Sequence, residues 1–297
     1  MALDPTHLSA LAAILRLGSF DAAAAALGVT PSAISQRVKA LEEKVGATLV
    51  HRGQPAQATA LGARLAKHAE DIALLEAQAL GNRGMEVAPA PRLTLAVPAD
   101  SLATWLIPAL AAVPDLFYDL RIDDQDTSHD WLRNGAVSAA LTGHDRAAPG
   151  CDVFALGALR YVATASPAFV ARYFDPDLNG QTLMDAPMLT YSEKDQLQNR
   201  WIRKITGKKL LPHSHQLPSS HGFVDAAHCG LGWGMNPLSL VAGDLASGRL
   251  VALGNMTPLD VPLYWQVSRV MAPALSDLTR SIRQIARKTL LPLDKAG

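Results

Sequence analysis

The chain has 297 residues, 49% hydrophobic and 18% charged, so it can form two or three domains with large cores and is unlike a wholly disordered chain. Lys plus Arg and Asp plus Glu number 27 each, so overall charge neither requires nor excludes nucleic acid as a partner. No apolar run reaches the roughly 18 residues that span a bilayer, and no secretory signal pattern opens the sequence. The two cysteines, Cys151 and Cys229, lack metal-ligand spacing and fit a reducing compartment. These observations predict a cytoplasmic protein.

Three short helices are expected within the first fifty residues. The first carries an apolar stripe from Leu8 to Leu15 and ends at Gly18, a residue that readily adopts the left-handed conformation. The second is an alanine-rich segment that Ser19 can cap. The third starts with Thr30 as its N-cap, followed by a proline at the first helical position, where both residue types are favoured.

The third expected helix has a polar face in its first half. Short polar side chains there would let the backbone enter a major groove, while Gln36 and Arg37 reach base edges. A short β wing is expected next, with Arg52 placed to meet a phosphate. The pattern alone leaves an ordinary helical bundle with a solvated face as the alternative. The candidate DNA-contacting residues are Thr30, Pro31, Ser32, Ser35, Gln36, Arg37, Lys39 and Arg52.

A longer helix is expected from Thr59 to about Leu80. Its apolar positions step by four and three residues, as in a coiled-coil seam. We expect this helix to pair with a second copy, forming a dimer, rather than to pack on its own domain. The Gly- and Pro-rich segment that follows marks a domain boundary. The seam consists of Leu61, Leu65, His68, Ile72, Leu75 and Ala79.

The segment from Ser19 to Arg52, S-F-D-A-A-A-A-A-L-G-V-T-P-S-A-I-S-Q-R-V-K-A-L-E-E-K-V-G-A-T-L-V-H-R, resembles the winged helix-turn-helix of the LysR-type transcriptional regulators. The resemblance implies binding to double-stranded promoter DNA and a homotetramer built from dimers. It divides the chain into a winged helix-turn-helix at 1–58, a linker helix and hinge at 59–87, and an effector-binding domain at 88–297. Gln57 departs from the basic residue that many relatives carry after the wing.

Beyond the hinge, strands and helices alternate. Expected strands at 92–97, 118–122 and 137–142 alternate with helices, a pattern that predicts an α/β domain with a parallel sheet. The segments 226–237 and 244–251 resemble the family's effector domain, which is similar to two-lobed periplasmic binding proteins. The resemblance places lobe I at about 92–160 and 267–292 and lobe II at about 161–266.

Ligands of such folds lie between the lobes, at strand C-termini and helix N-termini. Ser101 and its neighbouring amides are the candidates for holding a carboxylate, and Asp123 and Asp124 at a strand end are the candidates for a cation. A solvated acidic loop is the alternative for these aspartates, with Asp126 and Asp130 as turn and cap residues. The candidate effector-binding residues are Ser101, Thr104, Asp123, Asp124, Thr164, Ser219, Ser220 and Phe223, with Trp105 beside the aliphatic stem.

A finer resemblance concerns residues 97–110, 122–125 and 219–224, which look like the lysine- and arginine-sensing (ArgP/LysG-type) branch of the family. That branch implies activation of a basic amino-acid exporter gene in response to L-lysine or L-arginine, with RNA polymerase as a partner and no other cofactor. The alternative within the family is a regulator of another metabolic operon with a different small carboxylate effector.

Other classes of protein fit the sequence less well. Four histidines between His213 and His228 suggest a metal site, yet they lack the spacing of known zinc motifs. Asp123 and Asp124 are adjacent and would project to opposite sides of a strand, and no nucleophile elbow or phosphate loop is present, so an enzyme is not expected. A cytosolic solute-binding protein would account for the two lobes but not for residues 1–58.

Overall fold

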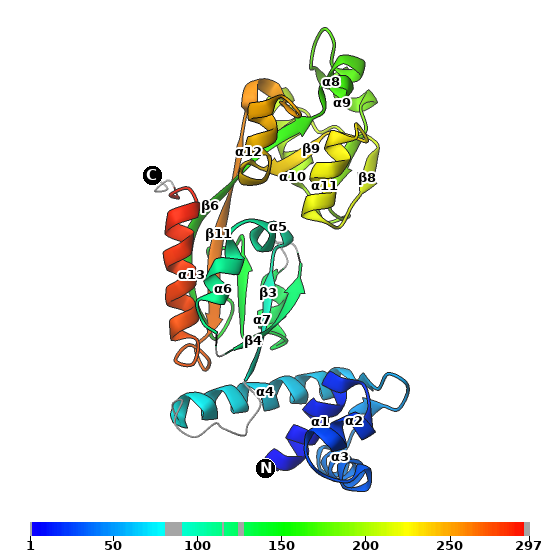
Figure 1. The fold of residues 1–297 in the computed structure, drawn as a ribbon, viewed down its shortest axis with the longest axis vertical. Coiled ribbons are helices and arrows are strands. Elements are labelled where there is room, and N and C mark those ends of the chain that lie inside the picture. The colour runs from blue at the N-terminus through cyan, green and yellow to red at the C-terminus, as the bar shows by residue number, and fades with distance from the viewer. Residues whose placement is uncertain (1, 81–90, 115, 124–127, 294–297) are drawn as a thin grey trace.

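The computed structural model describes residues 2–80, 91–114, 116–123 and 128–293. Three parts follow one another along its long axis: a helical N-terminal domain, the long helix α4, and a two-lobed α/β domain (Figure 1). Within these residues, no helix combines the length and the apolar character needed to cross a membrane.

The N-terminal domain contains three helices and a two-stranded wing with a core of their own. As predicted, Ser19 and Thr30 cap the second and third helices by accepting the backbone N–H of Ala22 and Ala33, and Gly18 ends the first in the left-handed conformation. The elements are α1 (Pro5–Leu17), α2 (Phe20–Ala26), α3 (Pro31–Val45), β1 (Val50–His51) and β2 (Gln57–Ala58).

Helix α4 (Ala60–Leu80) packs against helix α1 of the N-terminal domain. Leu61, Leu65 and Ile72 lie partly buried against the core of the N-terminal domain. The expectation that the seam avoids its own domain is therefore wrong for these three residues, because helix α1 presents an apolar face beside them. Gly62 permits the close approach of α4 to the wing, since a Cβ there would lie 2.0 Å from the carbonyl oxygen of Leu49.

In the described part of the chain, three side-chain hydrogen bonds join α4 to the α/β domain. The buried Lys67 ammonium lies 2.5 Å from Asp71 Oδ1 on the same helix and donates to Ser138 Oγ at 2.6 Å. Ser138 Oγ in turn donates to Asp71 Oδ1 at 2.8 Å, and Thr94 Oγ1 donates to Glu70 Oε2 at 3.3 Å. Since Thr94 lies on a strand of lobe I and Ser138 directly precedes another, this lobe is attached directly to the linker helix.

Lobe I has a parallel sheet in which β3 lies between β4 and β5. The three strands agree with the predicted ones to within two residues, and the parallel pairing is confirmed. The elements of this part are β3 (Arg92–Val97), α5 (Ala99–Ser101), a π-helical turn (Leu102–Leu106), α6 (Ile107–Ala111), β4 (Phe117–Ile122), α7 (Ser128–Arg133) and β5 (Ala139–Thr142).

Two long antiparallel strands, β6 (Cys151–Ala165) and β11 (Leu259–Ser268), run through both lobes (Figure 1). They make one sheet of the order β10-β6-β11-β5-β3-β4, with β9 also paired to β6. Residues 264–267 of β11 already pair with β5, so the chain returns to lobe I a few residues before the expected position 267. Helix α13 (Ser276–Thr289) then packs on lobe I against α6, as predicted.

Lobe II surrounds the far ends of these two strands (Figure 1). Its buried Trp201 and Trp233 share one continuous apolar core with Trp105 and Trp265 of lobe I. Its elements are α8 (Pro167–Tyr173), α9 (Gly180–Asp185), β7 (Met188–Thr190), α10 (Leu197–Thr206), β8 (Ser214–Gln216), α11 (Ser220–His228), β9 (Gly234–Pro237), α12 (Leu238–Ser247), β10 (Val251–Ala252) and a 3₁₀ turn (Gly254–Met256).

Candidate functional site

A narrow cleft separates the lobes at the C-terminal ends of β3 and β4, the position where α/β folds bind ligands. Its hollow of about 40 Å³ is too small for an amino acid, so a ligand of that size requires the lobes to separate. Lobe I contributes Pro98, Ala99, Asp100 and Asp123, and lobe II contributes Tyr191, Asp195, Leu197, Ser220, Phe223, Met235, Asn236 and Pro237.

Asp100 is the central carboxylate of this cleft. Its Oδ1 accepts the Ser220 hydroxyl of lobe II at 2.6 Å, and its Oδ2 accepts the Tyr161 hydroxyl at 2.8 Å. Burial raises the pKa of Asp100 above its ordinary value, although the two hydroxyls oppose the change, and Asp195 raises it further. Burial also raises the pKa of Tyr191, to which the charge of Asp100 adds. Asp100 was not among the predicted site residues.

Asp123 lines the same cleft from the end of β4, as predicted. Its Oδ2 accepts the indole N–H of Trp131 at 2.7 Å, which fixes the carboxylate against lobe I. Its Oδ1 lies 3.4 Å from the ammonium of Lys194, which belongs to the loop between β7 and α10 of lobe II. Asp124, the neighbouring candidate, and Asp126 lie outside the described residues, whereas Asp130 pairs with Arg133 on exposed α7.

Asp195 is a third carboxylate at the cleft, and its hydrogen bonds show that it stabilises the local backbone. Its two oxygens accept the backbone N–H groups of Tyr191 and Leu197, at 2.9 and 3.0 Å, and so shape the turn that leads into α10. Asn236, 1% exposed, donates to Thr164 through its amide nitrogen, while its oxygen has no hydrogen-bond partner in the described part of the chain. That oxygen is an acceptor available to a ligand.

The other predicted effector residues occupy less direct positions. Ser101 is fully buried beside the cleft, and its hydroxyl finds no partner among the described residues. Thr104 donates to the carbonyl oxygen of Asp100, Ser219 caps α11, and Thr164 is committed to Asn236. Ser220 holds Asp100 instead of facing the cleft as an independent donor. Phe223 lines the cleft, whereas Trp105 lies in the core beneath it.

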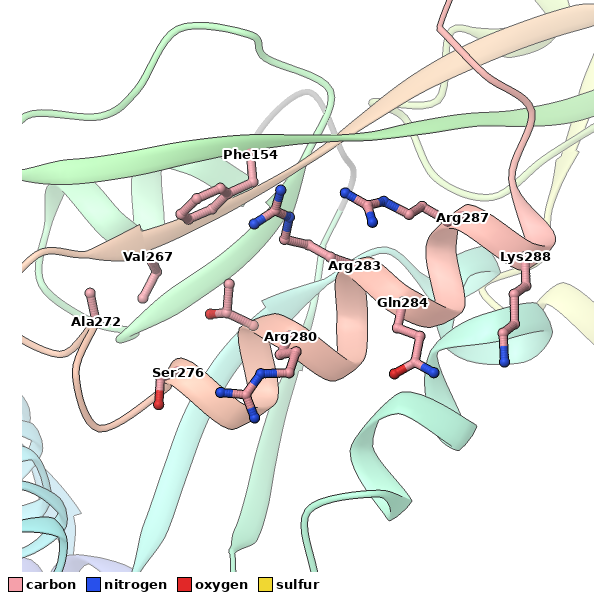
Figure 2. A pocket seen from close by; sticks show the side chains of 10 residues that line it. Phe154, Val267, Ala272, Ser276, Arg280, Arg283, Gln284, Arg287 and Lys288 are labelled. Atoms are coloured by element: carbon pink, nitrogen blue, oxygen red, sulfur yellow. The ribbon is translucent and has the colours of Figure 1, made fainter.

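Larger hollows occur elsewhere but have the wrong charge for a cation. A groove of about 720 Å³ runs beside α13, above Phe154, where Arg283 lies over the aromatic ring with 5.1 Å between guanidinium and ring centre (Figure 2). Arg280, Arg287 and Lys288 line the same groove, so it repels cationic ligands. A second hollow, of about 740 Å³, lies between α1, α4 and lobe I and also contains more basic than acidic side chains.

Most of the candidate DNA-contacting residues are exposed on the N-terminal domain. Ser32, Gln36 and Lys39 are exposed on α3, and Ser35 and Arg37 are partly exposed. The guanidinium of the exposed Arg52 lies 5.2 Å from the centre of the Phe20 ring, which orients it beside the start of α2. Glu42 accepts the backbone N–H of Leu49 at 2.7 Å and thereby ties α3 to the wing.

The four histidines considered as metal ligands are dispersed over lobe II. His213 and His215 lie on or beside β8, His221 is exposed at the start of α11, and His228 lies 3.2 Å from a carboxylate oxygen of Asp244. In the described ranges, no three His, Cys, Asp or Glu side chains come together in a metal-binding arrangement.

Two family models match the chain. One, described as the LysR substrate binding domain, matches residues 87–287. The other, described as the bacterial regulatory helix-turn-helix protein of the lysR family, matches residues 5–63. Together they span both the N-terminal domain and the two lobes.

Individual proteins are similar over the full length of the chain. The crystal structure of ArgP from Mycobacterium tuberculosis has a TM-score of 0.80 and 41% identity, covering 99% of this chain and 100% of that one. The lysine export transcriptional regulatory protein LysG of Corynebacterium efficiens is 38% identical over 97% of this chain and 99% of its own length. Full-length LysG from Corynebacterium glutamicum with bound effector Arg has a TM-score of 0.65 and 35% identity, covering 97% and 100%.

Proposed function

The chain belongs to the LysR family of bacterial transcriptional regulators, and we propose that it switches transcription in response to L-lysine or L-arginine bound between its lobes. The observation that carries the proposal is the pair of carboxylates at the cleft, Asp100 and Asp123. A basic amino acid has two cationic groups, and the cleft offers one carboxylate for each. Asp195 is left out of this pairing because backbone N–H groups, fixed by the turn into α10, occupy both its oxygens, whereas the hydroxyls bound to Asp100 can rotate.

The relatives support this choice of ligand. A neighbour of similar length and fold binds Arg, and a second relative is named for lysine export. An effector that is only a carboxylate is disfavoured, because it would place a third negative charge beside Asp100 and Asp123. We therefore infer that the promoter controlled by this protein serves a basic amino-acid exporter and that the protein acts in the cytoplasm, on double-stranded DNA and together with RNA polymerase.

The carboxylate of the ligand needs donors, and the helix that begins at Ala99 supplies them in this proposal. The first intrahelical hydrogen bond of this segment runs from the N–H of Leu102 to the carbonyl of Pro98. The earlier amides, from Ala99 to Ser101, are the ones that a helix start leaves open and that favour an anion. Ser101 with these amides keeps its proposed role, and Phe223 contacts the aliphatic stem.

Attachment of lobe I to α4 suggests how the ligand reaches the DNA. Contacts of Lys67 and Glu70 with lobe I join the linker helix to one lobe. When a ligand holds lobe II farther from lobe I, the outer surface of the pair changes, and with it the packing of subunits in a homotetramer. Because the third helix of each N-terminal domain would lie in a major groove, altered subunit packing changes the bend of the promoter.

Calorimetry on the full-length protein tests the ligand. Lysine and arginine should bind, while norleucine and citrulline, which have similar shapes but uncharged side chains, should bind about ten- to a hundred-fold more weakly, as expected for the loss of a charged hydrogen bond. Equal affinity for charged and neutral members of a pair would overturn the proposed cation site.

A further inference from the structure

One contact crosses the mouth of the cleft between groups of opposite charge. The ammonium of Lys194 on lobe II lies 3.4 Å from Asp123 Oδ1 on lobe I. The Asp123 side chain is 16% exposed and held by Trp131, whereas the Lys194 side chain is 60% exposed and extends from a loop. The carboxylate is thus the fixed partner and the lysine the movable one.

The chemistry of the movable partner is that of the proposed effector. Lys194 ends in the same ammonium group as free lysine, and it reaches the carboxylate that the cationic end of the ligand would use. Because the hollow of about 40 Å³ cannot hold an amino acid, the lobes must separate before one enters. Separation pulls Lys194 of lobe II away from Asp123 of lobe I, so the ion pair is broken by the same motion that admits the ligand.

We propose that Lys194 competes with the cationic end of the effector for Asp123 and thereby sets the concentration of effector at which the cleft fills. This inference rests on the proposed function. Each binding event exchanges one ion pair for another at Asp123, which lowers the net gain in free energy. Since an exposed ion pair contributes little, the competition weakens effector binding by a small factor of about two to five.

Substitution of Lys194 tests the competition. K194M keeps most of the side-chain length and removes the charge, so the affinity of the full-length protein for lysine and arginine should rise about two- to five-fold by calorimetry. K194R, which retains the charge, should bind nearly as the wild type does. The matched control is K209M, which removes the same charge from an exposed position of lobe II outside the cleft and should leave affinity unchanged.

A double-mutant cycle distinguishes a direct contact between Lys194 and Asp123 from a long-range effect of the lysine charge on the ligand. If Lys194 acts by contacting Asp123, K194M has no effect on affinity in a D123N background, whereas a general field effect persists there. Unchanged affinity in K194M overturns the inference. Weaker affinity in K194M also overturns it, because Lys194 would then hold the ligand's carboxylate. If neither wild type nor K194M binds a basic amino acid, the proposed function itself fails. Thermal melting of each variant verifies folding.

Discussion

At the scale of single residues, Asp100 combines a cost in stability with a proposed role in binding. Burial favours its protonated form, so the folded chain retains this proton to a higher pH than the unfolded chain does. Between the ordinary pKa and the raised one, the folded state holds more protons, and stability therefore falls as pH rises. Above the raised pKa the loss of folding stability is complete and no longer changes with pH.

The substitution D100N should remove the loss of stability that ionisation of the buried Asp100 causes. The amide can still accept from one hydroxyl and donate to the other, because the Ser220 and Tyr161 hydroxyls both rotate. We expect D100N to melt at a higher temperature than wild type above the raised pKa, with the difference shrinking as the pH falls through the raised pKa to the ordinary one. It should also bind basic amino acids more weakly. A difference in melting temperature that does not depend on pH would contradict the ionisation of Asp100 as its cause.

The position of Asp100 in the cleft was not predicted from the sequence around it. Asp123 was predicted from its place at the end of a parallel strand, and the same logic applies to Asp100, which lies three positions after the last residue of β3. A helix also starts there, and its free N–H groups suit a carboxylate, so Ser101 with its neighbouring amides was predicted as an anion site and Asp100 was not considered. The hydrogen bonds from Tyr161 and Ser220, 61 and 120 residues away, carry no local signal in the sequence.

At the scale of secondary-structure elements, α3 presents the proposed DNA-reading surface. The double substitution S35A plus R37A removes a hydroxyl and a guanidinium from that surface without touching the buried Ile34, Val38 and Leu41. Specific promoter binding should fall by at least tenfold in a mobility-shift titration, since each good base contact contributes about 1–3 kcal/mol.

A matched control lies on α1. S9A plus R16A removes the same two residue types from exposed positions of the same domain, and it should leave promoter affinity within about twofold of wild type. If S35A plus R37A retains the wild-type footprint, or if both double variants lose it equally, the assignment of α3 as the DNA-reading helix is wrong.

Helix and strand boundaries were predictable because their signals are local. Thr30 with its following proline, and the apolar runs of β3 to β5, specify their own conformation. The packing partner of α4 was not predictable in the same way. A stripe at four- and three-residue steps indicates that one face is buried, but it does not say whether α1 or a second copy buries it.

At the scale of the whole molecule, hydrogen bonds of Ser138 and Thr94 link lobe I to α4. The variant S138A plus T94V removes the lobe I hydroxyls that make these three bonds while leaving the Lys67–Asp71 pair on α4 in place. Because α4 then loses its polar attachment, we expect the effect of a saturating basic amino acid on promoter affinity to fall by about fivefold or more. Effector affinity itself should stay near wild type, since neither residue lines the cleft: Thr94 lies in the first half of β3 and Ser138 precedes β5.

The comparison requires DNA titrations with and without effector, in the variant and in a control such as S276A, which removes an exposed hydroxyl from the start of α13. An effector response as strong as that of wild type would show that coupling to the DNA-binding domain does not depend on these three hydrogen bonds.

The strands β6 and β11 have a further consequence for how such a sensor can be re-engineered. Each strand contributes to both lobes, and the apolar core is continuous from Trp105 to Trp201. A graft of lobe II alone would have to cut both strands in mid-ladder and would divide one core between two parents. Exchange of specificity is therefore feasible only as the complete two-lobed unit, or as point changes at the cleft, where Asp100 and Asp123 stand on a scaffold that remains intact.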